Sequence, residues 1–251
     1  MKEIIAVINQ KGGVGKSTTA AALGSGLTLR GFNVLLIDLD AQGNLTFNMG
    51  AGGRALSSLE VLTGTATARE ALIHTAQGDI IPSSPALAGA EHLITATGKE
   101  YRLKEALEPL LDEYEYIIID TPPALSILTV NALTACTGAV IPAQADPWSL
   151  QGISFLAQTV DTVRKYCNRA LKVKGIVLTR YNARSVITRD MTELIDQTAA
   201  RMSTKVYQAK IRECQALKEA QAVQESIFQY APRSNAAADY KALLDEIIEE
   251  A

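Results

Sequence analysis

The chain has 251 residues, of which 47% are hydrophobic and 20% are charged. This composition excludes a disordered protein, and the length suits one α/β domain built around a large sheet. The amino-terminal apolar run is too short for a signal peptide, and no stretch approaches the roughly 20 residues that span a bilayer. We therefore expect a cytoplasmic protein in which residues 1–251 form a single domain.

The net charge of −3 is unevenly distributed along the chain. Residues 164–218 carry 13 basic and 4 acidic side chains, whereas residues 219–251 carry 2 basic and 7 acidic ones. A basic segment in an otherwise acidic protein can form a positive face that attracts a polyanion. Solvated helix faces are the alternative interpretation, because blocks of like charge also aid solubility.

Short apolar strands alternate with helical segments along most of the chain. Residues 3–8 predict a strand, Ser17 to Arg30 a helix, and Val34 to Ile37 a second, buried strand. Further strands are expected at Tyr116–Ile119, Ala139–Ile141 and Val173–Leu178. The alternation predicts an α/β fold: a doubly wound, mostly parallel sheet flanked by helices and joined by right-handed crossovers.

Two further regions complete the predicted elements. Residues 41–97 are rich in small and polar residues, with short helical pieces expected at Leu56–Thr63 and Ala68–His74, and should decorate the carboxyl edge of the sheet. The last segment, Ala238–Glu250, has apolar residues at three-and-four spacing and predicts a helix with one packed face. Its other face is acidic.

A glycine-rich loop follows the first strand and opens the first helix. Backbone N–H groups that converge on a phosphate need glycine for their conformation and for close approach. Lys16 then supplies charge to the β- and γ-phosphates, and the Ser17 hydroxyl is suited to bind Mg²⁺. The sequence thus predicts a P-loop NTPase fold with ATP and Mg²⁺ as cofactors, the nucleotide being held by Lys11, Gly12, Gly13, Val14, Gly15, Lys16, Ser17 and Thr18. A strict motif would place glycine where this chain has Gln10.

Acidic residues follow two of the predicted strands. Asp120 ends an apolar strand just before Thr121, which places a carboxylate at the sheet edge where a Mg²⁺-bound water is expected. Asp38 and Asp40 follow the second strand and should have different roles, because alternate residues of an extended chain point in opposite directions. One is expected to face the metal and phosphates, and the other to orient a water for attack on the γ-phosphate.

Three motifs together resemble the ParA/Soj branch of the deviant-Walker ATPases. They are the loop at residues 11–18, the segment Asp38-Leu39-Asp40-Ala41-Gln42-Gly43-Asn44, and the segment from Tyr116 to Pro123. The resemblance continues through Asn131–Ala135, Val140–Pro142 and Pro232–Ser234, and so covers essentially the whole chain. This chain has Ala41 where the family commonly has proline.

The resemblance implies a composite site. Lys11 is expected to contact ATP bound to the other subunit of a sandwich homodimer, so that dimerisation depends on the γ-phosphate. Asp40 matches the water-orienting residue of the family, and Asp120 its Mg²⁺-linked aspartate. The expected catalytic residues are therefore Lys11, Lys16 and Asp40, and the expected metal site comprises Ser17, Asp40 and Asp120.

The resemblance also implies partners. ATP-bound dimers of the family bind DNA without sequence preference, and a ParB-type protein stimulates their slow hydrolysis. Arg184 matches a DNA-contacting arginine, Lys218 lies near another such position, and Arg189 belongs to the same basic segment. We expect DNA partition as the function, with the ATP-bound protein on the nucleoid. No amino-terminal helix-turn-helix extension is expected, because the first strand begins at Lys2 or Glu3.

Several alternatives share the phosphate loop. A MinD-like membrane regulator should end in a basic amphipathic helix, whereas this chain ends with Asp245, Glu246, Glu249 and Glu250, so no membrane partner is expected. An iron–sulfur ATPase would need paired cysteines, but the three cysteines here are scattered. A biosynthetic ligase is disfavoured by Lys11 together with the Asp38–Asn44 motif. A ParA-like ATPase that positions a protein cargo stays open.

Overall fold

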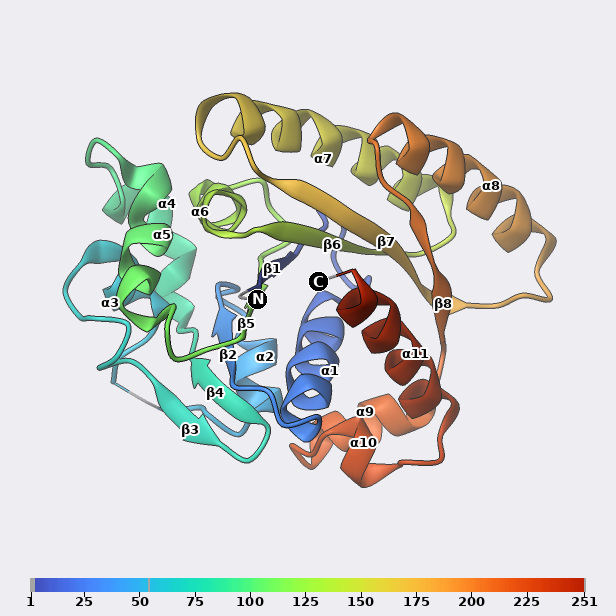
Figure 1. Cartoon of the computed structure of the whole chain (residues 1–251), viewed down its shortest axis with the longest axis horizontal. Coiled ribbons are helices and arrows are strands. Elements are labelled where there is room, and N and C mark those ends of the chain that lie inside the picture. The colour runs from blue at the N-terminus through green and yellow to red at the C-terminus, as the bar shows by residue number, and fades with distance from the viewer. Residues whose placement is uncertain (1–2, 54, 251) are drawn as a thin grey trace.

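The computed structural model describes residues 3–53 and 55–250, and its centre is an eight-stranded sheet (Figure 1). The strand order is β3-β4-β2-β5-β1-β6-β7-β8, and only the β3–β4 pair is antiparallel. The strands are β1 (Glu3–Val7), β2 (Val34–Asp38), β3 (Ile73–Thr75), β4 (Gly78–Ile81), β5 (Tyr116–Asp120), β6 (Gly138–Ala143), β7 (Lys172–Tyr181) and β8 (Val206–Arg212). The predicted doubly wound, mostly parallel sheet is confirmed.

Helices cover both faces of this sheet. On one face lie α3 (Ser58–Thr63), α4 (Ala90–Leu93), α5 (Arg102–Leu107), α6 (Ile127–Ala135), α7 (Pro147–Tyr166) and α8 (Val186–Arg201). On the other lie α1 (Lys16–Leu29), α2 (Asn44–Asn48), α9 (Gln215–Ala222), α10 (Ile227–Tyr230) and α11 (Asn235–Glu249). Short 3₁₀ turns occupy Pro85–Gly89, Lys99–Tyr101 and Glu108–Leu110.

The alternation of side chains along β1 divides the core in two. Ile4 and Ala6 face the cluster beneath α5, α6 and α7, whereas Ile5 and Val7 face the cluster beneath α1 and α11. Both faces of the central strands are therefore buried, as their uninterrupted apolar sequences predict. Helix α1 lies unusually close to the sheet, since a Cβ added to Gly24 would be only 2.6 Å from Leu36 Cδ2.

The parallel register brings the carboxyl ends of the central strands together. Val7 and Asp38 are both paired in register with Asp120, so β1, β2 and β5 end at the same level. The loops after β1, β2, β5 and β6 therefore open onto one edge of the sheet. That edge holds the phosphate loop and both acidic motifs.

Residues 41–97 differ from the prediction in one respect. The helix expected at Leu56–Thr63 is present as α3, but the helix expected at Ala68–His74 is wrong, because a turn leads there into β3. Ala68 and Ala71 are buried, which gave the segment a helix-like apolar spacing. The hairpin forms instead because Gly78, at φ 116°, allows a tight turn into β4. The region thus extends the sheet as well as decorating its edge.

The two ends of the described chain follow the sequence pattern. Strand β1 begins at Glu3, while Lys2 lies outside the described residues. Helix α11 starts at Asn235, capped by the Ser234 hydroxyl, which accepts a hydrogen bond from the Ala237 N–H. Among residues 3–53 and 55–250, no helix combines the length and apolarity needed to span a bilayer.

Candidate nucleotide-binding site

The predicted phosphate loop runs from the end of β1 into α1. Gly13 and Gly15 adopt φ of 75° and 86°, a region that a side chain disfavours. The first turn of α1 is closed by the Thr19 N–H, which donates to the Gly15 carbonyl at 2.8 Å. A Cβ added to Gly12 or Gly13 would meet nothing within 4 Å, so open space lies beside the loop. The backbone has the form of an anion-binding cradle at a helix N terminus.

Lys16 lies in the centre of this cradle and is only 7% exposed. Its ammonium donates to the Lys11 carbonyl oxygen at 3.2 Å. Burial lowers the pKa of Lys16, while the charges of Asp120 and Asp40 act in the opposite direction. A buried cation at a helix N terminus is costly without an anion, and the arrangement is suited to accept one.

Asp120 is fully buried, and neither of its carboxylate oxygens has a hydrogen-bond partner among the described residues. Burial raises the pKa of Asp120 well above its usual value, and the nearby charge of Asp38 adds to this effect. Ser17 and Lys16 lower the pKa of Asp120 and so oppose this rise, which places the carboxylate close to the start of α1. A buried carboxylate with free oxygens beside a hydroxyl fits the hard, oxygen-rich environment that Mg²⁺ prefers.

We expect Asp120→Asn to stabilise the nucleotide-free protein at neutral pH by about 1 kcal/mol, because burial of the carboxylate is only partly offset by the charge of Lys16. The gain should shrink as the pH falls, since wild-type Asp120 has a raised folded-state pKa and takes up a proton on acidification. Urea unfolding of both proteins at several pH values measures the difference. A gain that is constant with pH, or a loss of stability, would contradict a buried Asp120 whose ionised form is disfavoured in the folded protein.

Asp38 organises the loop after β2. Its two oxygens accept hydrogen bonds from the Asp40 N–H at 3.0 Å, from the Thr46 N–H at 2.8 Å and from the Thr46 hydroxyl at 2.7 Å. Burial raises the pKa of Asp38 to about 6, and the hydrogen bonds from Thr46 oppose that rise. The oxygens of Asp38 are thus engaged within the loop, whereas the assignment of one aspartate to the metal and the other to the water stays a prediction.

Asp40 has a freer carboxylate. One of its oxygens accepts from the Gln42 N–H at 3.1 Å, and the side chain is 9% exposed at the sheet edge. Its carbonyl is held by the Gly43 N–H at 2.9 Å and by the Ser83 hydroxyl. These contacts restrain the loop although Ala41 replaces the usual proline. Asp40 also acts electrostatically on Lys16, so it belongs to the same cluster.

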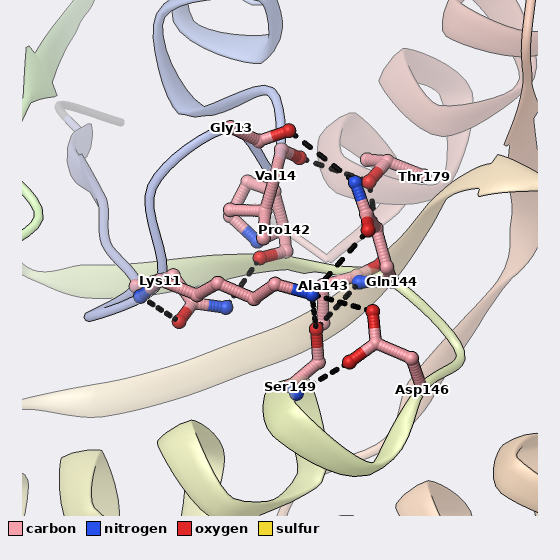
Figure 2. Close-up of polar contacts among 10 residues, drawn as sticks. Lys11, Gly13, Val14, Pro142, Ala143, Gln144, Asp146, Ser149 and Thr179 are labelled. Atoms are coloured by element: carbon pink, nitrogen blue, oxygen red, sulfur yellow. Dashed lines mark hydrogen bonds and ion pairs between the residues drawn. The ribbon is translucent and has the colours of Figure 1, made fainter.

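Lys11 points away from this cluster. Its ammonium lies 2.5 Å from Asp146 Oδ2, 3.4 Å from Gln144 Oε1 and 3.5 Å from Ser149 Oγ (Figure 2). Gln144 also donates to the Gly13 carbonyl at 3.3 Å, which ties the phosphate loop to the segment between β6 and α7. Sequence reasoning missed this set. The signal was the capping pair Asp146-Pro147 three residues after the end of buried strand β6, at the sheet edge that also holds the phosphate loop.

A small cavity of about 110 Å³ adjoins the phosphate loop on the side of α9. Its lining includes Val14, Gly15 and Thr18 of the loop and helix α1, together with Arg180, Cys214 and Gln221. Gln221 Nε2 donates to Thr18 Oγ1 at 2.8 Å, which joins α9 to α1. The cavity offers mixed polar and apolar walls next to a phosphate site. Sequence reasoning did not identify Arg180, Cys214 or Gln221 as site residues, because they lie far from the phosphate loop in the sequence.

The three basic residues predicted to bind DNA are all exposed, but they lie in two separate parts of the chain. Arg184 precedes α8 and Arg189 lies within its first turns, whereas Lys218 lies on α9. Lys218 is 4.0 Å from Glu213, and neither arginine has an ion-pair partner among the described residues. Val186 and Ile187 are 61% and 57% exposed beside the arginines.

This geometry defines a class of protein. A glycine loop between a buried strand and a helix, with a buried lysine and acidic residues at neighbouring strand ends, belongs to a P-loop nucleotide-binding protein. Comparison with known proteins gives the family. Residues 2–173 match the family model AAA_31, described as an AAA domain. The sporulation initiation inhibitor protein Soj of Bacillus subtilis is 39% identical, covering 98% of both chains. The chain belongs to the ParA/Soj family of P-loop ATPases.

Two further comparisons extend this result. The chromosome partitioning protein ParA of Caulobacter vibrioides is 36% identical, with 98% of this chain and 93% of that protein covered. A crystal structure of cobyrinic acid a,c-diamide synthase from Mycobacterium smegmatis, with bound ATP analog and magnesium, is 34% identical. It has a TM-score of 0.86 and covers 99% of this chain and 94% of its own. The predicted family and fold are therefore confirmed.

Proposed function

We propose that this chain is a single-domain partition ATPase that binds DNA as an ATP-bound homodimer and releases it after hydrolysis. The observation that carries the proposal is Lys11, a second cation in the phosphate loop whose ammonium is directed away from Lys16. The lysine that the resemblance assigns to the nucleotide of a partner subunit is thus present, and its ammonium lies against Asp146 rather than in the phosphate cradle of its own chain. Relatives named Soj and ParA that match over nearly the whole chain support the same function.

The nucleotide is ATP, held at residues 11–18, and the metal is Mg²⁺, held through Ser17, Asp40 and Asp120. When bound, Mg²⁺ supplies charge that neutralises the phosphate oxygens and the buried carboxylates together. Lys16 binds the β- and γ-phosphates, which removes the cost of its burial. Asp40 orients the attacking water. The base of the nucleotide occupies the cavity beside Thr18 and Gln221.

DNA is held by exposed Arg184 and Arg189, just before and near the start of α8, and by Lys218 of α9. Contacts from lysine and arginine to phosphates release counterions, so affinity should fall steeply with salt and depend little on sequence. A ParB-type protein accelerates hydrolysis and so frees the DNA. The ATP-bound protein is then found on the nucleoid and the ADP-bound protein in the cytoplasm.

We expect Arg184→Glu to weaken DNA binding by about tenfold or more and to lower the slope of log affinity against log salt by about one or two. ATP hydrolysis without DNA should be unaffected, since Arg184 lies outside the phosphate cluster. Filter binding at several salt concentrations checks this. Lys104→Glu, an equal charge change on exposed α5, is the control. If the two variants retain DNA equally, α8 does not carry the DNA face.

The proposal is tested by measuring DNA retention with Mg²⁺-ATP, with ADP and without nucleotide. Strong, salt-sensitive retention with ATP alone supports the partition ATPase. DNA retention that is the same with ATP, with ADP and without nucleotide rejects the proposed function. The absence of retention in all three conditions rejects it as well. The likeness to a protein named as a synthase gives the competing activity, a biosynthetic use of ATP that needs no nucleic acid.

A further inference from the structure

The Lys11 ammonium is surrounded by acceptors of its own chain, although the residue is expected to bind the nucleotide of a second molecule. A lysine ammonium has three donors. Here Asp146, Gln144 and Ser149 place three acceptors within 3.5 Å of it (Figure 2). No donor is left for a phosphate. Lys11 must give up these contacts before it can reach a nucleotide.

Asp146 is the charged member of this set, and its two oxygens have separate partners. Oδ1 accepts from the Ser149 N–H at 2.8 Å and caps α7, while Oδ2 pairs with Lys11 at 2.5 Å. Although partial burial opposes ionisation, the hydrogen bonds from Lys11 and the Ser149 backbone lower the pKa of Asp146. The carboxylate is therefore charged at neutral pH. A helix cap alone needs only one oxygen and no charge.

We propose that Asp146 is a positioning residue that holds Lys11 within its own chain. The ion pair breaks when the phosphates of an ATP bound to a second copy of this chain take the place of Asp146 beside Lys11. The proposal rests on the proposed ATP-dependent dimer and adds its regulation. Each protomer exchanges the Asp146–Lys11 ion pair for contacts with the phosphates of its partner. The γ-phosphate adds negative charge, so ATP competes for Lys11 better than ADP does. The ion pair thus weakens the dimer by stabilising the monomer.

The expected size of this effect follows from exposure and symmetry. Both side chains of the pair are 27% exposed, so its net contribution is modest, worth about threefold in an equilibrium constant. A symmetric dimer breaks two such pairs, one in each protomer. Removal of the charge at Asp146 should therefore strengthen the dimer by about tenfold.

The test uses Asp146→Asn and Asp146→Ser, since asparagine and serine both cap helices well and so preserve the start of α7. Asp161→Asn is the matched control: Asp161 lies on the same helix and pairs with Arg164 at 3.4 Å on the surface. Dimer dissociation constants are measured by sedimentation velocity at saturating AMPPNP and Mg²⁺. Thermal unfolding verifies that each variant is folded.

Both Asp146 variants should dimerise with a dissociation constant about tenfold below wild type, and Asp161→Asn should match wild type. The gain should diminish as salt increases, because salt also screens the wild-type ion pair, an effect that a purely structural role would not produce. A dissociation constant for both Asp146 variants equal to or above that of wild type overturns the inference while leaving the dimer intact. A wild-type protein that stays monomeric overturns the proposed function and this inference together.

Discussion

Lys16→Ala is expected to abolish ATP binding, with affinity reduced on the order of a hundredfold or more. The ammonium is the buried cation at the centre of the phosphate cradle, and charge-assisted hydrogen bonds to phosphate are among the strongest polar contacts in proteins. Its removal also takes a positive charge away from Asp120 and Asp40, which leaves a site that repels an anion more strongly. Isothermal titration calorimetry with ATP and Mg²⁺ measures the loss.

The control for this variant is Lys104→Ala, which removes an equal charge from exposed α5. It should bind ATP like wild type. Circular dichroism should show that Lys16→Ala is folded, because the burial of this lysine is costly without a ligand and its loss relieves that cost. If folded Lys16→Ala binds ATP as wild type does, the assignment of the phosphate loop is wrong.

Asp40→Ala should bind ATP and dimerise but hydrolyse it at least about a hundredfold more slowly, which is the usual effect of losing a residue that orients or activates a water. The loop should keep its conformation. The variant loses the hydrogen bond from the Gln42 N–H to the side chain, but the backbone carbonyl of residue 40 keeps its bonds to Gly43 and Ser83. The consequence is a dimer that accumulates with ATP. Phosphate release and light scattering on the same sample measure both effects.

Asp40→Asn is the matched variant, because the amide oxygen can still accept from Gln42 while the charge is gone. It should be equally slow. Hydrolysis near the wild-type rate in both variants would show that another group orients the water. A variant that stays monomeric with ATP would instead show that Asp40 is needed for the dimer itself.

The central sheet and the phosphate loop could be predicted well from the sequence because each depends on local chemistry. The apolar runs that form β1, β2 and β5 can be stable only when buried on both faces, and glycines at positive φ have few other uses between a strand and a helix. Because parallel strands end at a common edge, the positions of Asp38, Asp40 and Asp120 after buried strands suffice to predict that they lie together. The register agrees, since it pairs Asp38 directly with Asp120.

The missed features depend on contacts between distant segments. Strand β3 is short, and its pairing with β4 rather than its own three residues makes it a strand. Asp38 and Asp40 differ in their hydrogen bonding because Thr46, eight residues after Asp38, donates to the Asp38 carboxylate. The Lys11–Asp146 pair joins positions 135 residues apart in the sequence. Lys11 belongs to the phosphate loop, and Asp146 lies in none of the recognised motifs. Such pairings are invisible to a local pattern.

We propose that ATP converts this chain from a monomer to a dimer through its phosphate loop. The most direct test is the molar mass of the wild-type protein, measured by light scattering with Mg²⁺-ATP, with Mg²⁺-ADP and without nucleotide. We predict a mass near that of the 26.9 kDa chain without nucleotide and with ADP, and twice that value with ATP. A mass that is the same in all three conditions would contradict ATP-dependent dimerisation.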